Sequence, residues 1–223
     1  RLVASHPGVQ ESYIMLARAR YSEGDYEGVI GKIDEWPGVL EEQIPMLILK
    51  ARSFQALAFD NEAHDEWAKI VVIDPENVEA QFRMGQIDYN KRRYEDAKER
   101  LEATLQIDPE YKAARRLIGL CYDALGETGT ASEWLLKEAI SDPLLYSNWL
   151  KIVDVLLKEG NEEACRDLIE RMPEYVGENH KSVWFPFLLS KSIGWSERSD
   201  ELWHSVLEKI SINVETLEEV VED

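Results

Sequence analysis

The chain has 223 residues and a formal net charge of −19, which arises from 25 Lys and Arg residues against 44 Asp and Glu residues. Hydrophobic residues make up 44% of the chain and charged residues 31%, the balance of a folded, helix-rich protein rather than of a disordered one. A net negative charge of this size repels phosphate backbones, so we expect no nucleic-acid partner.

A period of 34 residues runs through most of the chain. Pro75, Pro109 and Pro143 are spaced by 34 residues, and each follows an Asp. One column of this period holds small residues: Val29, Ala63, Ala97, Ala131, Cys165 and Ser199. A second column holds mostly large apolar residues: Ile33, Trp67, Leu101, Leu135, Ile169 and Trp203. Small side chains beside large ones predict helices that pack closely, as in a solenoid of helical hairpins.

The period divides the chain into repeats. Residues 1–9 fall in register with the second helix of a preceding repeat, so we expect them to be the end of one. Six tandem repeats are predicted to follow, at 10–43, 44–77, 78–111, 112–145, 146–179 and 180–213. Each is predicted to form a helix, a turn and a second helix, and a hairpin of this kind must stack on its neighbours to bury its apolar face.

The first and fifth repeats depart from this pattern near their ends. Trp36-Pro37 places a proline about a turn before the usual end of the second helix, and Met172-Pro173 does the same four periods later. Proline cannot donate to the preceding helical turn, so we expect both second helices to stop early. Longer connections, which often carry contacts, are predicted at 38–43 and 174–181.

The third and fourth repeats carry the most specific residues. Residues 78–111 contain Met84-Gly85, Tyr94, Ala97 and Pro109, and residues 112–145 contain Ile118-Gly119, Tyr122, Gly126, Ala131 and Pro143. These positions resemble the signature of the tetratricopeptide repeat (TPR) family. The resemblance extends over about nine tenths of the chain. It implies an all-α fold, an α-solenoid of six helix-turn-helix repeats without β-sheet, whose role is to hold another protein.

The C-terminal part matches the pattern less closely. Repeat 146–179 ends on Gly177 in place of proline, and repeat 180–213 contains Pro186 within its first helix. That helix is expected to kink or to begin at Pro186. Residues 214–223 place Val214, Leu217, Val220 and Val221 at helical spacing among glutamates. We expect an acidic amphipathic helix that caps the last repeat, with docking in a groove as the alternative.

The candidate binding site follows from the resemblance, because the first helix of each TPR pair lines a concave face. It assigns to this groove Ile14, Arg18, Ile48, Arg52, Phe82, Arg83, Gln86, Arg116, Lys151, Trp184 and Phe185. Basic residues predominate there, against the overall charge of the chain. Guanidinium groups on a partly apolar floor suit an acidic, amphipathic segment of a partner, extended or helical. The competing interpretation is that each arginine pairs with an acidic neighbour in its own solenoid.

No pattern in the sequence indicates catalysis. The four histidines lack metal-binding spacing, and there is no nucleophile motif or phosphate-binding glycine loop. Cys121 and Cys165 indicate neither a disulfide framework nor a zinc site. We therefore expect a protein that is not an enzyme, with no catalytic residue, no metal and no cofactor.

The leading interpretation is a protein-protein interaction scaffold. The alternative is a regulatory or targeting domain of a larger enzyme, or of a bacterial secretion, pilus or polysaccharide-export assembly. No run approaches the roughly 18 apolar residues that a membrane span needs, so we expect this fragment not to insert into a membrane. A soluble cytoplasmic or periplasmic location and self-association both stay open.

Overall fold

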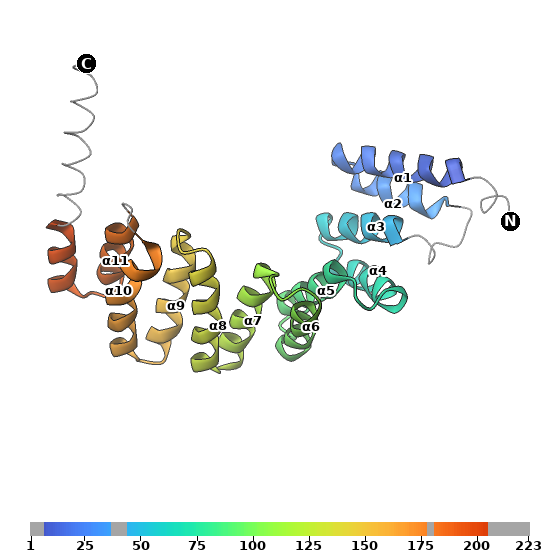
Figure 1. Ribbon diagram of the computed structural model, residues 1–223. Helices are drawn as coiled ribbons and strands as arrows, with labels where there is room; N and C mark the ends of the chain where they lie inside the picture. Colours follow the sequence, from blue (N-terminus) through green and yellow to red (C-terminus); the bar gives the residue numbers. More distant parts are fainter. Residues whose placement is uncertain (1–6, 37–43, 178–180, 205–223) are drawn as a thin grey trace, which may run out of the picture. The chain divides into compact units, whose positions relative to one another are not determined.

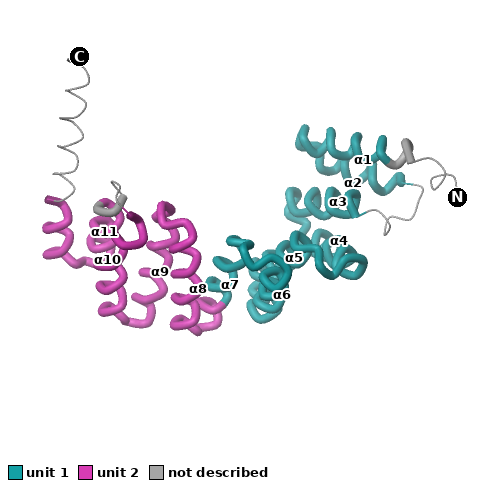
Figure 2. The backbone as a smooth tube through the Cα atoms, in the orientation of Figure 1, with its two compact units in different colours: residues 1–121 teal, residues 122–223 magenta. Residues whose placement is uncertain are grey.

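The computed structural model describes residues 7–36, 44–177 and 181–204. Within these ranges all regular secondary structure is helical, and no strand occurs (Figure 1). The chain divides into two compact units, Arg1–Cys121 (unit 1) and Tyr122–Asp223 (unit 2), with the boundary inside one helix (Figure 2). The predicted helix at 214–223 lies outside the described residues.

Unit 1 is a succession of helical hairpins. Its helices are α1 (Pro7–Ser22), α2 (Tyr26–Asp34), α3 (Ile44–Ala56), α4 (Asp60–Ile73), α5 (Val78–Asn90), α6 (Tyr94–Ile107) and the greater part of α7 (Lys112–Leu125). Helix α1 begins at Pro7, ahead of the expected start of the first repeat at Gln10, because proline is well tolerated in the first helical turn. Side-chain caps support other starts: Asp25 accepts from the Gly28 amide at 2.9 Å, and Asn77 accepts from the Ala80 amide at 3.1 Å.

Unit 2 continues the same arrangement. It contains α8 (Thr128–Ser141), α9 (Tyr146–Lys158), α10 (Glu162–Val176) and α11 (Lys181–Ser192), and residues 196–204 are also helical. Asn161 caps α10 by accepting from the Ala164 amide at 3.1 Å. The first helices of successive pairs are therefore α1, α3 and α5 in unit 1, and α9 and α11 in unit 2.

The two columns of the period form the core. All six small-column residues are buried, and Cβ or short side chains there let the second helix of each pair lie close to its neighbours. In the large column Ile33, Trp67, Leu101, Leu135 and Ile169 are buried as well. Truncating such a residue to alanine typically costs about 2–5 kcal/mol. Trp203 is the exception, with 39% of its surface exposed.

Gly85 allows a close approach of α5 and α6 in unit 1. A Cβ atom at this position would lie 2.9 Å from Leu101 Cγ, closer than Cβ atoms approach other atoms in real structures, and a tight 3.2 Å from the Ala97 carbonyl oxygen. Helices α5 and α6 pack this closely only because residue 85 has no side chain.

The turn inside each hairpin uses a left-handed residue at one fixed position of the repeat. Gly24, Gly126, Gly160 and Gly194 occupy it with φ between 70° and 82°. Ala58 and Arg92 occupy it in the second and third repeats, with φ of 60° and 61°. Residues other than glycine pay about 1–2 kcal/mol for this conformation, so unit 1 contains two strained turns.

The structure corrects two expectations about proline. Helix α2 ends early, at Asp34, as predicted, but α10 continues through Pro173 to Val176. Met172 and Val176 are buried on either side of Pro173, which holds the last turn in place, and Gly177 ends the helix with a φ of 75°. Pro186 lies inside α11, which begins at Lys181, so the expectation that a helix starts at Pro186 is wrong.

Each unit contains one cysteine in its core. Cys121 in unit 1 and Cys165 in unit 2 are fully buried, and both thiols are free. Burial raises the pKa of Cys121 to about 12, and it raises the pKa of Cys165 as well.

Candidate partner-binding site

The predicted groove residues fall into both units. Lys151, Trp184 and Phe185 belong to unit 2, and the other eight belong to unit 1. Their apolar members mostly support the core: Phe82 and Phe185 are only 6% and 7% exposed, and Ile14 and Ile48 pack against core clusters. Among these four apolar residues, little side-chain surface is therefore left for a partner.

Unit 1 brings part of the predicted set together in one cavity, which we call the arginine hollow. It measures about 560 Å³ and is lined by Tyr21 of α1, by Arg52, Gln55 and Ala56 of α3, and by Arg83 and Gln86 of α5. These are the first helices of three successive hairpins. Arg52, Arg83 and Gln86 were predicted from the sequence. Tyr21, Gln55 and Ala56 were missed, although each lies one helical turn after Arg18 or Arg52 on the same face.

Arg52 already holds a carboxylate of its own chain. Its Nε and Nη2 atoms donate to the two carboxylate oxygens of Glu79 at 2.8 and 2.7 Å. Glu79 lies in the first turn of α5, where the helix dipole also favours a negative charge. The competing interpretation from the sequence, an internal pair, thus applies to Arg52. The same geometry shows that a carboxylate fits its planar fork.

Arg83 is less completely satisfied. Its Nη1 atom donates to Gln86 Oε1 at 3.0 Å, and its guanidinium carbon lies 5.8 Å from the centre of the Phe82 ring. Its Nε atom is buried without a hydrogen-bond partner, and the closest carboxylate oxygen, on Glu79, is 3.8 Å away. A buried N–H that lacks an acceptor is costly, so Arg83 is held less completely by its own chain than Arg52 is.

The other basic residues of the predicted groove differ in whether they pair with a carboxylate of their own chain. Arg18 and Arg116 are exposed, and neither has an ion-pair partner among the described residues. Lys151 donates at 3.1 Å to both Asp123 and Asp154, and Lys158 pairs with the same two carboxylates. The hydrogen bond to Asp123 raises the pKa of Lys158, and the hydrogen bond from Lys151 lowers the pKa of Asp154. Lys151 is therefore engaged within unit 2.

Trp184 belongs to an aromatic cluster in unit 2. Its ring centre lies 6.1 Å from that of Phe187 and 6.3 Å from that of Trp203, and the Phe187 and Trp203 centres are 5.3 Å apart. Phe185 points elsewhere and packs against Tyr146, with ring centres 5.2 Å apart. Aromatic pairs at these distances stabilise the packing of their helices.

In the described ranges, no group of at least three His, Cys, Asp or Glu side chains could hold a metal ion. None of the helices formed by the described residues has both the length and the apolar character needed to cross a membrane.

Comparisons with known proteins establish the fold. No known protein-family profile matches the chain. FK506-binding protein 59 of Drosophila melanogaster is 26% identical over 120 residues, which are 54% of this chain and 25% of that protein. The chain thus spans about a quarter of the length of this relative.

Among solved structures, MamA superimposes with a TM-score of 0.67 at 20% identity, over 74% of this chain and 90% of MamA. PilF of Pseudomonas aeruginosa gives 0.61 at 20% identity, over 98% and 100% of the two chains. YrrB, described as a TPR protein with an unusual peptide-binding site, gives 0.62 at 16% identity, over 77% and 88%. The predicted fold, an all-helical solenoid of tetratricopeptide type, is confirmed.

Proposed function

We propose that this chain is a protein-protein interaction scaffold, and that the arginine hollow of unit 1 binds a carboxylate-bearing segment of a partner. The observation that carries the proposal is the convergence of Arg52, Arg83 and Gln86 from successive first helices on one cavity. The likeness to YrrB, a TPR protein with a peptide-binding site, supports a binding role for this fold.

The chemistry of the hollow favours an anionic ligand. Two guanidinium groups and two side-chain amides line it, and no carboxylate is among its lining residues. Hydrogen bonds to a charged group contribute about 1.5–3 kcal/mol each, more than neutral ones. A cavity of about 560 Å³ that extends over three helices suits several residues of a segment rather than a single side chain.

Glu79 competes with a ligand carboxylate for Arg52. Its carboxylate occupies Arg52, so a partner carboxylate either shares that guanidinium or binds through Arg83. Reversing the charge of Arg52 would place two carboxylates face to face and destabilise unit 1. Arg83 is therefore the better residue for a binding test.

The test uses two short synthetic peptides with the same helical pattern, one of Leu and Glu and one of Leu and Lys. The Leu–Glu peptide should bind the intact chain, and Arg83→Gln should weaken this binding about tenfold or more, since a charge-assisted contact is lost. Arg92→Gln, the same change at an exposed position outside the hollow, is the matched control and should leave the affinity within about twofold.

Two further measurements sharpen this test. Glu79→Gln should tighten binding of the Leu–Glu peptide, because Arg52 becomes available. Affinity should fall as salt rises from about 0.05 to 0.5 M, as expected for charges at a solvated surface. If Arg83→Gln and salt both leave the affinity unchanged, the partner site lies elsewhere, and the aromatic cluster of Trp184 is the next candidate.

A further inference from the structure

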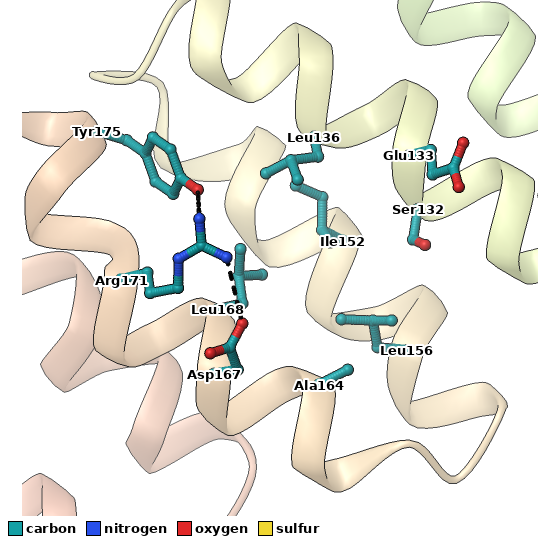
Figure 3. Close-up of a pocket in the computed structure, with 10 residues that line it drawn as sticks. All are labelled: Ser132, Glu133, Leu136, Ile152, Leu156, Ala164, Asp167, Leu168, Arg171 and Tyr175. Atoms are coloured by element: carbon teal, nitrogen blue, oxygen red, sulfur yellow. Dashed lines mark hydrogen bonds and ion pairs between the residues drawn. The ribbon is translucent and has the colours of Figure 1, made fainter.

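Unit 2 contains an open crevice that the groove hypothesis does not use. It lies between α8 and α10 over α9, measures about 180 Å³, and is called the α8–α10 crevice below (Figure 3). Its apolar lining includes Leu136 of α8, Ile152 and Leu156 of α9, and Leu168 of α10. It is formed mainly by the second helices of two hairpins, whereas the arginine hollow is formed by first helices.

Charged side chains stand on both walls of the crevice. Glu133 lies on α8 and Asp167 lies on α10, on opposite sides of the apolar floor (Figure 3). Arg171 partly compensates Asp167, since their charged atoms are 3.6 Å apart, and its Nη2 atom donates to Tyr175 Oη at 2.8 Å. Glu133 has no ion-pair partner within the described part of the chain. The walls therefore carry a net negative charge.

The 34-residue period allows a direct comparison with unit 1. Two periods before Ser132 and Leu156 lie His64 of α4 and Asp88 of α5. His64 Nε2 is 3.5 Å from Asp88 Oδ1, and Arg93 donates to the same carboxylate oxygen. An imidazole, a carboxylate and a guanidinium thus contact one another at this place in unit 1. The chain supplies no such set of contacts in unit 2, where Ser132, Leu156 and Asn161 occupy the corresponding positions.

We infer that the α8–α10 crevice is a second docking site, which takes a segment of another protein with one large apolar side chain flanked by Lys or Arg. A cavity of about 150 Å³ lined by aliphatic side chains accepts a benzene-sized group, so the crevice holds one such side chain. The flanking cation pairs with Glu133. Residues 214–223 of this chain do not fit this description, because they contain five acidic residues and no basic one.

The Leu–Lys peptide is the probe for this site, and the Leu–Glu peptide is its control. We expect the Leu–Lys peptide to shift the methyl NMR signals of Ile152 and Leu168 in the full chain. Ala164→Leu fills the crevice from α10 and should abolish these shifts. Glu133→Lys leaves the apolar floor intact and should weaken binding about tenfold, the effect of a lost charge-assisted contact.

The matched control is Glu163→Lys, the same charge reversal at an exposed position on α10 that does not line the crevice. It should change the affinity by less than about twofold, as expected for an exposed charge that does not line the crevice. Equal weakening by Glu133→Lys and Glu163→Lys would mean that only net charge attracts the peptide, and would overturn the proposal. Equal binding of the Leu–Glu peptide at the crevice would overturn it as well.

Discussion

In unit 1 Asp88 of α5 contacts both His64 of α4 and Arg93, which lies in the turn before α6. In unit 2 the corresponding place is an open apolar crevice. Both units keep the small column in their cores, and apart from Trp203 they also keep the large column there. The positions that pack the helices in the two columns and the positions that fill this place in unit 1 are therefore different positions of the repeat.

The largest expected loss of stability comes from replacing Leu156 of unit 2 with aspartate, the residue at the corresponding position 88 of unit 1. Leu156→Asp would put a carboxylate where the native side chain is 7% exposed and where neither a His nor an Arg stands at the positions that correspond to His64 and Arg93, at a cost of about 3 kcal/mol. Adding Ser132→His and Asn161→Arg supplies counterparts of His64 and Arg93, the partners of Asp88. These changes should restore about half of the lost free energy of unfolding. Urea denaturation followed by circular dichroism measures both values.

Asn161→Arg alone is the necessary control, because Asn161 also caps α10. Its own cost should be about 1 kcal/mol, the usual value for a lost N-cap. If the triple variant is no more stable than Leu156→Asp combined with Asn161→Arg, the added histidine does not stabilise the new carboxylate in unit 2.

A smaller loss is expected from deleting residues 214–223. Trp203 is exposed at the end of the described core, and the apolar face predicted for Val214 and Leu217 would cover it. Loss of about 1–2 kcal/mol should lower the melting temperature of unit 2 by several degrees. The variant Glu215→Gln, which removes a charge but keeps the apolar face, should melt like the intact chain. A truncated chain that melts unchanged would mean that these residues do not cap the last repeat.

The turns provide a third contrast between the units. Every described turn of this type in unit 2 has glycine at the left-handed position, whereas unit 1 has Ala58 and Arg92. Ala58→Gly and Arg92→Gly should each stabilise the chain by about 1 kcal/mol through release of strain. Gly126→Ala should destabilise it by about the same amount, since no atom lies within 4 Å of the added Cβ and only the backbone conformation opposes it. Thermal melts of the three variants should therefore shift in opposite directions.

The smallest effect concerns pH. Burial lowers the pKa of His64 below its ordinary value of 6.5, and Arg93 lowers it further, while Asp88 opposes them. The unfolded chain therefore binds this proton near pH 6.5, and folded unit 1 binds it only at lower pH. Stability from this group is complete above pH 6.5 and decreases as pH falls below it. His64→Gln should flatten this part of the stability profile, and the exposed His204→Gln should not.

Much of the fold could be predicted from the sequence because a period is a strong signal. The small column, the large column and the glycines at the turns all recur at fixed spacing, and each has one physical reason. Pro173 was misjudged because its neighbours Met172 and Val176 are held by tertiary packing, which overrides the local preference of proline. Its position in the period gave no sign of that packing.

The candidate sites were only partly predictable. Arg52, Arg83 and Gln86 could be assigned to one face, but the partner of Arg52 is Glu79, which belongs to the following repeat and was not considered. The α8–α10 crevice was missed for a different reason. It forms where Leu156 stands in place of Asp88, two periods earlier. The sequence alone does not show that Asp88 has partners, so its replacement by Leu156 gave no signal of a crevice.

The two buried thiols allow the opening of each unit to be measured by its rate of chemical modification. A thiol reacts with an alkylating reagent only as a solvent-exposed thiolate, so Cys121 and Cys165 become modified only when their surroundings open. At reagent concentrations where opening is in rapid equilibrium, each modification rate reports the free energy of opening around one cysteine. Mass spectrometry of the two cysteine peptides would thus measure, in a single sample, whether the units open together or separately.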